Sequence, residues 1–380
     1  EIAQCLVGSE MCIRDSHMRT VKTQDLTPGM ITAEPVLSKH GQLIVAADTE
    51  LTNQMIAHLS YYNIPSASIL DGTIPPAAIA SMQKTEQVTL SYSQKIRSSR
   101  SFQRFKSDYV KRIRFLKSSL NDLIDRTDPI DQAELLSESV GLFGKQSTTI
   151  SIFDNLHNMR QIDDSTYAHC LNVSIISRMF GMWLKYSDED LDVLTLAGLL
   201  HDIGKCKIPN AIILKKGKLT DAEYEVIKAH AQLGYDILKD QPLDERIKNA
   251  ALMHHERYDG TGYPNHLVGK EIDDMAAIVA IADVYDAMTS DRCYRRALCP
   301  FEVIASFELE GLNRYNPQFI LCFLEHIANT YVNNNVLLSN GQTGKIILIT
   351  QRLTRPVIQL EDQTFLDLND RPDLYIQAII

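Results

Sequence analysis

The chain has 380 residues, of which 44% are hydrophobic and 23% are charged, and its formal net charge is −10. This composition is typical of a globular protein of two or three domains, and it excludes collagen-like, intrinsically disordered and disulfide-scaffold proteins. No apolar run reaches the ~20 residues that a membrane-spanning helix needs, and the excess of acidic residues disfavours a partner that is a nucleic-acid polymer.

The first 18 residues, EIAQCLVGSEMCIRDSHM, contain neither a secretory signal nor a periodic segment, and His17-Met18 resembles a cloning scar. We assign residues 1–18 to an expression tag and leave them out of the fold. Five cysteines remain, namely Cys170, Cys206, Cys293, Cys299 and Cys322. Because their number is odd and no CxxC pair or secretion signal accompanies them, they predict reduced thiols and a cytoplasmic protein.

Residues 19–72 alternate short apolar segments with turns, one of them at Pro28-Gly29, and include one short amphipathic stretch. This pattern predicts a small α+β module. The module has no cluster of His, Cys or carboxylate side chains. We therefore expect it to serve in docking or regulation, with a structural cap as an equal alternative.

Residues 73–148 are predicted to be a linker followed by connecting helices. The linker contains Pro75-Pro76, and the basic segment after it has apolar residues at helical spacing: Phe102, Phe105, Tyr109, Ile113, Leu116 and Leu120. A segment of this kind could lie on a membrane surface or on nucleic acid. We expect instead a connecting or dimerising helix whose positive face is solvated.

The sequence pattern predicts a succession of helices over residues 128–330. We place the main helical domain at 149–332. Asp128, Ser187 and Thr220 are positioned to cap helices, followed by Pro129 or by acidic residues in the first turn. Residues 333–380 contain short β-branched runs separated by Gly, Asn and Pro, which predict a β-rich extension. The expected fold is mainly α, with an α+β module before the helices and a short β-rich tail after them.

Histidines and aspartates occur in the helical domain where apolar residues would be expected. His201-Asp202 ends the run LDVLTLAGLL, His254-His255 ends another apolar helix, and Asp283 interrupts IVAIADVYDAM. Burying such groups without partners is costly, and a metal is the simplest partner for several acceptors at once. Imidazole and carboxylate ligands without thiolate suit iron, manganese or a similar ion. Taken singly, His169 or His230 would be explained more simply as a hydrogen-bonded core residue.

Three segments together resemble the HD-GYP family, bacterial phosphodiesterases of the HD superfamily that act on cyclic di-GMP. The segments are HDIGK, HHERYDGTGYP and ADVYDAMTSDRCYR, and the resemblance covers about residues 150–330. The LTPGM start and the β-rich tail also resemble the companions of this domain in one subgroup. The resemblance implies an all-helical, metal-dependent phosphohydrolase domain.

Specific roles follow from the resemblance. It implies that His169, His201, Asp202 and Asp283 bind one metal, and that Asp202 bridges to a second metal held by His230, His254 and His255. Lys205 matches the lysine that contacts the scissile phosphate, so the catalytic residues would be Asp202 and Lys205. The substrate-binding positions would be Lys205, Gly262, Tyr263, Pro264, Arg292 and Arg295.

Two departures from the family pattern affect these expectations. Some members hold a third metal with a glutamate four residues before the first ligand histidine, where this chain has Ser165. We therefore expect two divalent metals per site. The family often has proline where this chain has Cys293, which makes the roles of Arg292 and Arg295 less secure.

The resemblance implies hydrolysis of cyclic di-GMP to linear pGpG and on to GMP, by a two-metal bridging hydroxide that attacks the phosphodiester. Two alternatives stay open: a phosphodiesterase for another cyclic dinucleotide such as cyclic GMP-AMP, and a signalling receptor that binds a nucleotide or a protein with little turnover. Signalling proteins could dock at the GYP loop or the N-terminal module, and a homodimer is compatible with the family. A di-iron oxygenase on a similar scaffold is disfavoured by Lys205 and the GYP segment.

Overall fold

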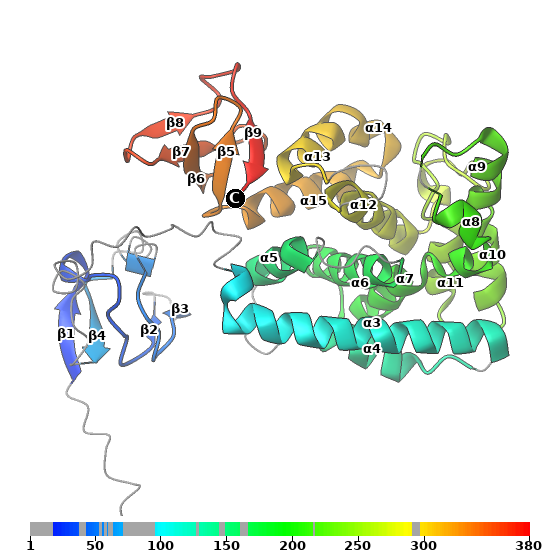
Figure 1. Cartoon of the computed structure of the whole chain (residues 1–380), viewed down its shortest axis with the longest axis horizontal. Helices are drawn as coiled ribbons and strands as arrows, with labels where there is room; N and C mark the ends of the chain where they lie inside the picture. Colours follow the sequence, from blue (N-terminus) through cyan, green and yellow to red (C-terminus); the bar gives the residue numbers. More distant parts are fainter. Residues whose placement is uncertain are drawn as a thin grey trace, which may run out of the picture. The chain divides into compact units, whose positions relative to one another are not determined.

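The computed structural model describes residues 18–37, 43–52, 55–56, 59, 64–70, 96–126, 129–143, 149–159, 166–215, 217–290 and 297–380 (Figure 1). The chain divides into two compact units, Glu1–Thr89 and Leu90–Ile380, which are described separately. The N-terminal tag prediction falls outside the described residues except for Met18, which begins the first strand.

The N-terminal unit is a small module of strands and turns. Its elements are β1 (Met18–Lys22), η1 (Thr23–Asp25), β2 (Val36–Leu37), β3 (Leu43–Val45) and β4 (Ser66–Leu70). β1 pairs antiparallel with β4, and β2 pairs antiparallel with β3. The predicted turn at Pro28-Gly29 is present, and Gly29 has a φ of 93°, a conformation that favours glycine.

The second unit is helical up to residue 330. Its elements are α3 (Arg100–Arg126), α4 (Gln132–Val140), α5 (Thr149–Met159), α6 (Thr166–Trp183), α7 (Asp188–Leu200), η3 (Ile203–Lys207), α8 (Asn210–Ile213), α9 (Asp221–Lys228), α10 (His230–Leu238), α11 (Glu245–Met253), η4 (Gly269–Glu271), α12 (Asp274–Thr289), α13 (Pro300–Ser306), η5 (Phe307–Gly311), α14 (Leu312–Arg314) and α15 (Pro317–Thr330). The prediction of a mainly helical fold is confirmed. Within the described residues, every helix is too short or too polar to cross a membrane.

Two of the three predicted N-terminal capping residues do begin a helix. Ser187 and Thr220 accept hydrogen bonds from the backbone of α7 and α9, as expected. The third prediction was wrong in position, because α4 begins at Gln132 and its cap is Asp131, whose carboxylate accepts from Glu134 N. Pro129 therefore precedes the helix, and Asp128 lies outside the described residues.

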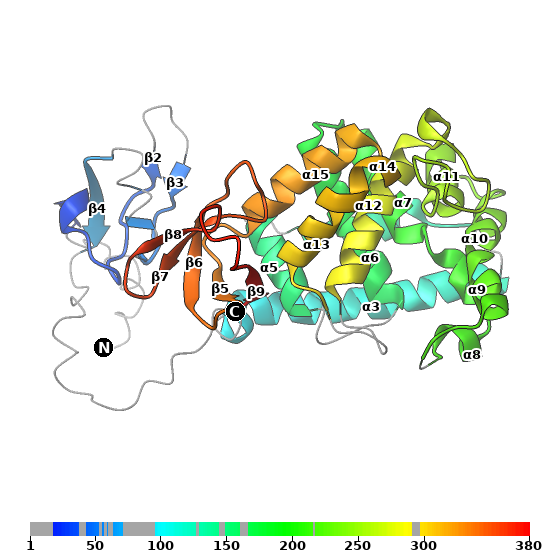
Figure 2. The same ribbon diagram turned by 90° about the horizontal axis from the view of Figure 1, so that it is seen from above.

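Helix α3 runs along the helical unit and packs against α4, α5 and α6 (Figure 2). The apolar residues spaced along it, from Phe102 to Leu120, are all buried in the core. This apolar face is therefore taken up by the protein itself, which rules it out as a membrane-binding surface. The charged face remains exposed, as expected of a connecting helix.

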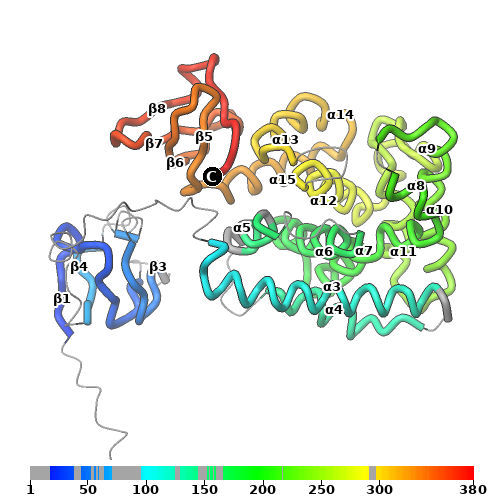
Figure 3. Tube along the Cα trace, in the orientation of Figure 1, coloured from blue at the N-terminus to red at the C-terminus, as the bar shows by residue number. Residues whose placement is uncertain are grey.

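The C-terminal β-rich extension is a single antiparallel sheet in the order β8-β7-β6-β5-β9, at the red end of the trace in Figure 3. Its strands are β5 (Asn335–Leu338), β6 (Thr343–Leu348), β7 (Val357–Leu360), β8 (Phe365–Asp367) and β9 (Ile376–Ile379). The sequence runs predicted the first four strands but not β9. Buried residues of the sheet, such as Val336 and Ile358, belong to the same hydrophobic cluster as the helices.

Candidate metal centre

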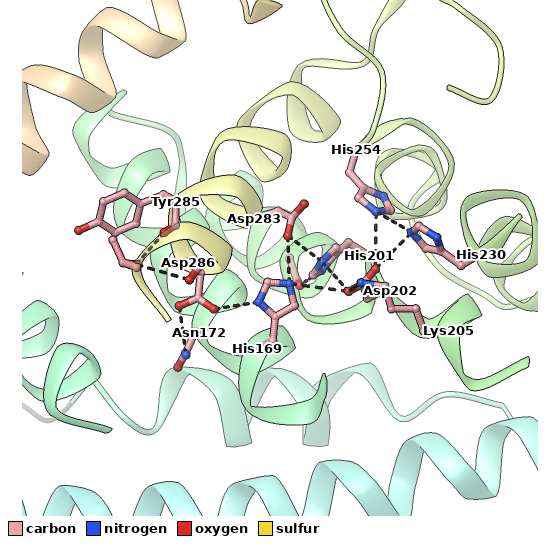
Figure 4. Close-up of polar contacts among 12 residues, drawn as sticks. His169, Asn172, His201, Asp202, Lys205, His230, His254, Asp283, Tyr285 and Asp286 are labelled. Atoms are coloured by element: carbon pink, nitrogen blue, oxygen red, sulfur yellow. Dashed lines mark hydrogen bonds and ion pairs between the residues drawn. The ribbon is translucent and has the colours of Figure 1, made fainter. Parts of the chain in front are cut away.

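Seven candidate ligands converge from different elements of the helical unit. All of them except His255 are labelled in Figure 4. His169 lies within α6 and Asp283 within α12, whereas His201, Asp202, His230, His254 and His255 lie at or just beyond helix ends. Helix α7 is buried along almost its whole length after the first turn. Its C-terminus therefore delivers His201 and Asp202 into the protein interior, where they are 0% and 1% exposed.

The ligand atoms form two adjacent groups, each with its atoms within 4.8 Å of one another. One group contains His169, His201 and Asp283, and the other contains Asp202, His230, His254 and His255. Asp202 faces both groups. Its Oδ2 lies 3.4 Å from His201 Nε2, and its Oδ1 lies 3.3 Å from His230 Nε2.

The imidazoles are held with Nε2 directed at the centre. The Nδ1 of His201 donates to Gly198 O at 2.8 Å, that of His230 to Ile227 O at 2.6 Å, and that of His254 to Ala250 O at 2.9 Å. Because Nδ1 carries the proton in each case, Nε2 presents a lone pair. His230 Nε2 and His254 Nε2 approach to 3.2 Å, so two lone pairs face each other there.

Two buried atoms in the centre lack a hydrogen-bond partner within the described part of the chain: His201 Nε2 and Asp202 Oδ1. A buried acceptor without a partner is costly in a native protein. A cation would satisfy both atoms as well as the facing lone pairs of His230 and His254. The donor set of imidazoles and carboxylates, with no thiolate, fits a divalent first-row metal.

Electrostatics favour ionised carboxylates and neutral imidazoles in the second group. Burial holds the pKa of His230 at about 4 and lowers the pKa of His254 and of His255. Burial alone would raise the pKa of Asp202, but the positive charge of the neighbouring Lys205 holds it well below its usual range. Both effects prepare the side chains as metal ligands, since protons compete with metals.

Lys205 lies at the edge of the centre and contacts it directly. Its ammonium donates to Asp202 Oδ2 at 2.5 Å, and its side chain is 26% exposed, so it contacts a ligand and also reaches solvent. Burial would lower the pKa of Lys205, but the carboxylates of Asp202 and Asp283 raise it. The lysine therefore keeps its positive charge beside the centre.

The GYP segment packs on the second group. Gly262 is required by space, because a Cβ there would come within 2.3 Å of Arg257 N and 2.4 Å of Glu256 Cα. The Tyr263 ring stacks on His255 with ring centroids 4.7 Å apart, and its backbone N–H donates to His255 O. Pro264 follows through a cis peptide bond. Tyr263 thus contacts a candidate ligand, in addition to any contact with substrate.

Four residues that the sequence singled out lie outside the described residues: Ser165, Arg292, Cys293 and Arg295. The expectation of two metals in place of three, which was drawn from Ser165, therefore remains a prediction. The expectation that Arg292 and Arg295 bind the substrate likewise remains a prediction.

Two acidic residues that sequence reasoning left without a role lie directly behind the centre. Asp286 accepts a hydrogen bond from His169 Nδ1 at 2.8 Å. Glu256 is buried and accepts from the backbone N–H groups of Asn265 and Leu267, which anchors the GYP segment. Asp286 follows Asp283 by three residues, so its position on the same helix face was a usable signal.

The HD domain family model matches residues 132–319. This part of the chain is an HD domain. The matched range contains all seven candidate ligands, Lys205 and the GYP segment. The match to the HD domain model agrees with the resemblance drawn from the HDIGK segment.

Several proteins are similar to part of this chain. "Cyclic di-GMP phosphodiesterase PA4108" of Pseudomonas aeruginosa is 35% identical over 194 residues, covering 51% of this chain and 47% of that protein. "Cyclic di-GMP phosphodiesterase response regulator RpfG" of Xanthomonas campestris pv. campestris is 42% identical over 138 residues, 36% of each chain. "3'3'-cGAMP-specific phosphodiesterase 3" of Vibrio cholerae is 38% identical, covering 38% of this chain and 31% of that protein.

The chain therefore spans less than half the length of these three relatives. Among solved structures, "Bd1817, a HDG"Y"P protein from Bdellovibrio bacteriovorus" matches with a TM-score of 0.48 and 15% identity, covering 82% of this chain and 99% of that one.

Proposed function

We propose that this chain is a metal-dependent phosphodiesterase that hydrolyses a cyclic dinucleotide. The observation that carries the proposal is the orientation of Asp202, whose two oxygens face separate groups of imidazole and carboxylate donors. A shared carboxylate of this kind suits two cations held a few ångström apart, which is the usual arrangement for hydrolysis of phosphate esters. The partly exposed ammonium of Lys205 beside it suits an anionic substrate.

Cyclic di-GMP is the substrate that we propose first, opened to linear pGpG and then cleaved to GMP. Two similar proteins are named as cyclic di-GMP phosphodiesterases, which supports this choice. A third is named as specific for 3'3'-cGAMP, so cyclic GMP-AMP is the alternative substrate. The matches to these proteins span only about a third to a half of this chain.

The residues of the chain would share the work as follows. His169, His201 and Asp283 would hold one ion and His230, His254 and His255 the other, with Asp202 between them. Two divalent ions, iron or manganese, would acidify a water molecule and neutralise phosphate oxygens when bound. Lys205 would stabilise negative charge on the phosphate in the transition state. Gly262, Tyr263, Pro264, Arg292 and Arg295 would line the substrate.

Location and partners belong to the same proposal. The four described cysteines are free, which supports a reducing compartment such as the cytoplasm. Signalling partners at the GYP segment or the N-terminal module, and a homodimer, remain predictions from the resemblance.

The proposal is tested by product analysis on the purified full chain. The protein is stripped with a chelator, reloaded with Mn²⁺ or, under exclusion of air, with Fe²⁺, and incubated with cyclic di-GMP and with 3'3'-cGAMP. We expect metal-dependent formation of the linear dinucleotide, absent from the Asp202→Ala variant. Tight nucleotide binding by the metal-loaded chain without any product would contradict the proposal and support the receptor alternative.

A further inference from the structure

A chain of hydrogen bonds leads from His169 away from the metal centre to α3. His169 Nδ1 donates to Asp286 Oδ2 at 2.8 Å, and Asn172 Nδ2 donates to Asp286 Oδ1 at 3.2 Å. The hydroxyl of Tyr109 on α3 donates to Asn172 Oδ1 at 2.6 Å. All four residues are buried, so the chain is shielded from water.

His169 differs from the other histidines in the partner of its Nδ1. His201, His230 and His254 direct Nδ1 at backbone carbonyls three or four residues earlier, near the end of a helix. His169 lies within α6, and its Nδ1 instead donates to a side-chain acceptor, the Asp286 carboxylate.

The spacing of the residues couples this chain to the ligands. Asn172 lies one turn after His169 on α6, and Asp286 lies one turn after Asp283 on α12. The metal-facing pair, His169 Nε2 and Asp283 Oδ1, is 3.0 Å apart. Behind this pair, Asn172 of α6 is hydrogen-bonded to Asp286 of α12 (Figure 4). The contact between Asn172 and Asp286 therefore sets the geometry of the contact between His169 and Asp283.

The donor order is consistent along the chain. Tyr109 donates to the amide oxygen of Asn172, which leaves the amide N–H of Asn172 to donate to Asp286. The Asp286 carboxylate can then only accept from His169, so in the neutral imidazole Nδ1 carries the proton and Nε2 is the nitrogen left for a cation. Outer carboxylates of this kind orient metal-binding histidines in other proteins.

We infer that Asp286, Asn172 and Tyr109 are positioning residues that set the tautomer and ring orientation of His169 for a divalent cation shared with His201 and Asp283. The inference rests on the metal-binding part of the proposed function. Tyr109 precedes residues 132–319, so a helix outside the matched HD domain contributes to holding a ligand within it.

Equilibrium dialysis of the metal-free full chain against Mn²⁺, followed by elemental analysis, tests the inference without reference to turnover. We expect Asp286→Asn to weaken binding of one of two ions by about 10–100-fold, while the other ion stays bound. Tyr109→Phe removes the hydroxyl that contacts Asn172 Oδ1 at 2.6 Å and Ala168 O at 3.3 Å. Because these contacts lie further from the centre, we expect it to weaken binding of the same ion by about fivefold. At limiting Mn²⁺ the two variants should therefore hold one ion per chain.

Tyr285→Phe is the matched control. It removes a buried hydroxyl that bonds to Tyr331 OH at 2.6 Å, next to Asp286 in sequence but outside the chain to His169. Thermal unfolding with a chelator should show similar losses of stability for Tyr109→Phe and Tyr285→Phe. Only Tyr109→Phe should lose Mn²⁺ affinity.

A rescue variant tests the donor order. Combining Asn172→Asp with Asp286→Asn exchanges the amide and the carboxylate while retaining an acceptor for His169 and for Tyr109. We expect this double variant to bind Mn²⁺ more tightly than Asp286→Asn alone.

Three results would overturn the inference. They are wild-type Mn²⁺ affinity in both Asp286→Asn and Tyr109→Phe, an equal loss of affinity in Tyr285→Phe, and no gain in the double variant. In each of these cases the proposed function would stand. A wild-type chain that binds no Mn²⁺ or Fe²⁺ would instead remove the proposed function together with the inference.

Discussion

At the scale of single residues, Asp202 and Lys205 are neighbours with different tasks. Asp202 is buried and its two oxygens face both ligand groups. Lys205 contacts Asp202, but its side chain is partly exposed and it is not one of the seven candidate ligands. The two residues can therefore be separated by experiment even though their side chains touch.

We expect Asp202→Ala to abolish turnover and to lower the metal content, because a shared ligand and its charge are removed. Lys205→Ala should keep the metals but lower kcat by about 10²–10³-fold, as removal of one transition-state donor does elsewhere. Elemental analysis and product formation from cyclic di-GMP measure the two effects. A Lys205→Ala variant with wild-type turnover, or with as little metal as Asp202→Ala, would refute this division of roles.

The titration of the histidines predicts how the stability of the metal-free protein depends on pH. The folded chain holds the pKa of His230 at about 4, whereas an unfolded chain takes up this proton near pH 6.5. Between these values the unfolded state binds more protons, so the free energy of unfolding falls as pH drops. The loss is on the order of 3 kcal/mol for His230, and His254 and His255 act in the same direction.

His169 gives the opposite dependence on the alkaline side. Burial would lower the pKa of His169, but its hydrogen bonds to Asp283 and Asp286 raise it. Its stabilising contribution is present below the unfolded pKa and is lost as pH rises through the folded value. Urea unfolding with a chelator should therefore show a free energy of unfolding that rises from about pH 5 through pH 6.5, because three histidines outweigh His169 there, with the His169 contribution opposing the rise at higher pH. His230→Gln should flatten the acid side.

At the scale of elements, close backbone contacts bring the ligand-bearing helix ends together. Gly204 in η3 lies against α10, where a Cβ would come within 2.0 Å of His230 O and 2.5 Å of Gly234 N. η3 follows Asp202 directly, and α10 begins at His230. The distance between these two ligands therefore depends on a glycine that carries no chemistry itself.

Gly204→Ala should separate η3 from α10, with a loss of about 1–3 kcal/mol in the free energy of unfolding. It should also weaken Mn²⁺ binding, because Asp202 and His230 move apart. Gly234→Ala, in the same interface, is the control, since its Cβ would meet Gly204 N and Ala251 Cβ at 3.4 and 3.5 Å, which is ordinary contact. Retention of full stability and Mn²⁺ affinity by Gly204→Ala would show that the backbones can shift apart at no cost.

At the scale of the whole molecule, one hydrophobic cluster extends from α3 to β9, while the N-terminal module has its own small cluster. Leu116 of α3, Ile281 of α12 and Ile376 of β9 are members of the larger cluster. The C-terminal sheet is therefore part of the helical unit's core, whereas the N-terminal module is a separate compact unit.

Removing residues 1–89 should leave a chain that unfolds cooperatively and binds Mn²⁺ like the full protein. Removing residues 333–380 should lower the melting temperature or cause aggregation, because buried residues of α13 would lose the β9 residues packed on them. Calorimetry on both truncated chains measures the difference. Equal melting temperatures for the second truncation and the full chain would show that the sheet contributes nothing to the core.

The sequence by itself determined the helical domain and the β-rich tail, and its resemblance to the HD-GYP family supplied the seven candidate ligands. The helices and strands depend on local patterns: apolar periodicity and capping residues such as Ser187 and Thr220. Such patterns are visible within a few turns of chain. The same local reasoning misplaced the start of α4, because Asp128 and Asp131 are both plausible caps and only the hydrogen bond to Glu134 N distinguishes them.

The resemblance already implied two groups of ligands with Asp202 between them. Only the tertiary structure showed the hydrogen bonds that link Asp286, Asn172 and Tyr109 to His169. Tyr109 and Asp286 are 177 positions apart in sequence and meet through α6. Contacts of this kind depend on how helices pack, and packing is set by the whole buried surface. A hydrogen bond between distant helices therefore leaves no local pattern from which it could be predicted.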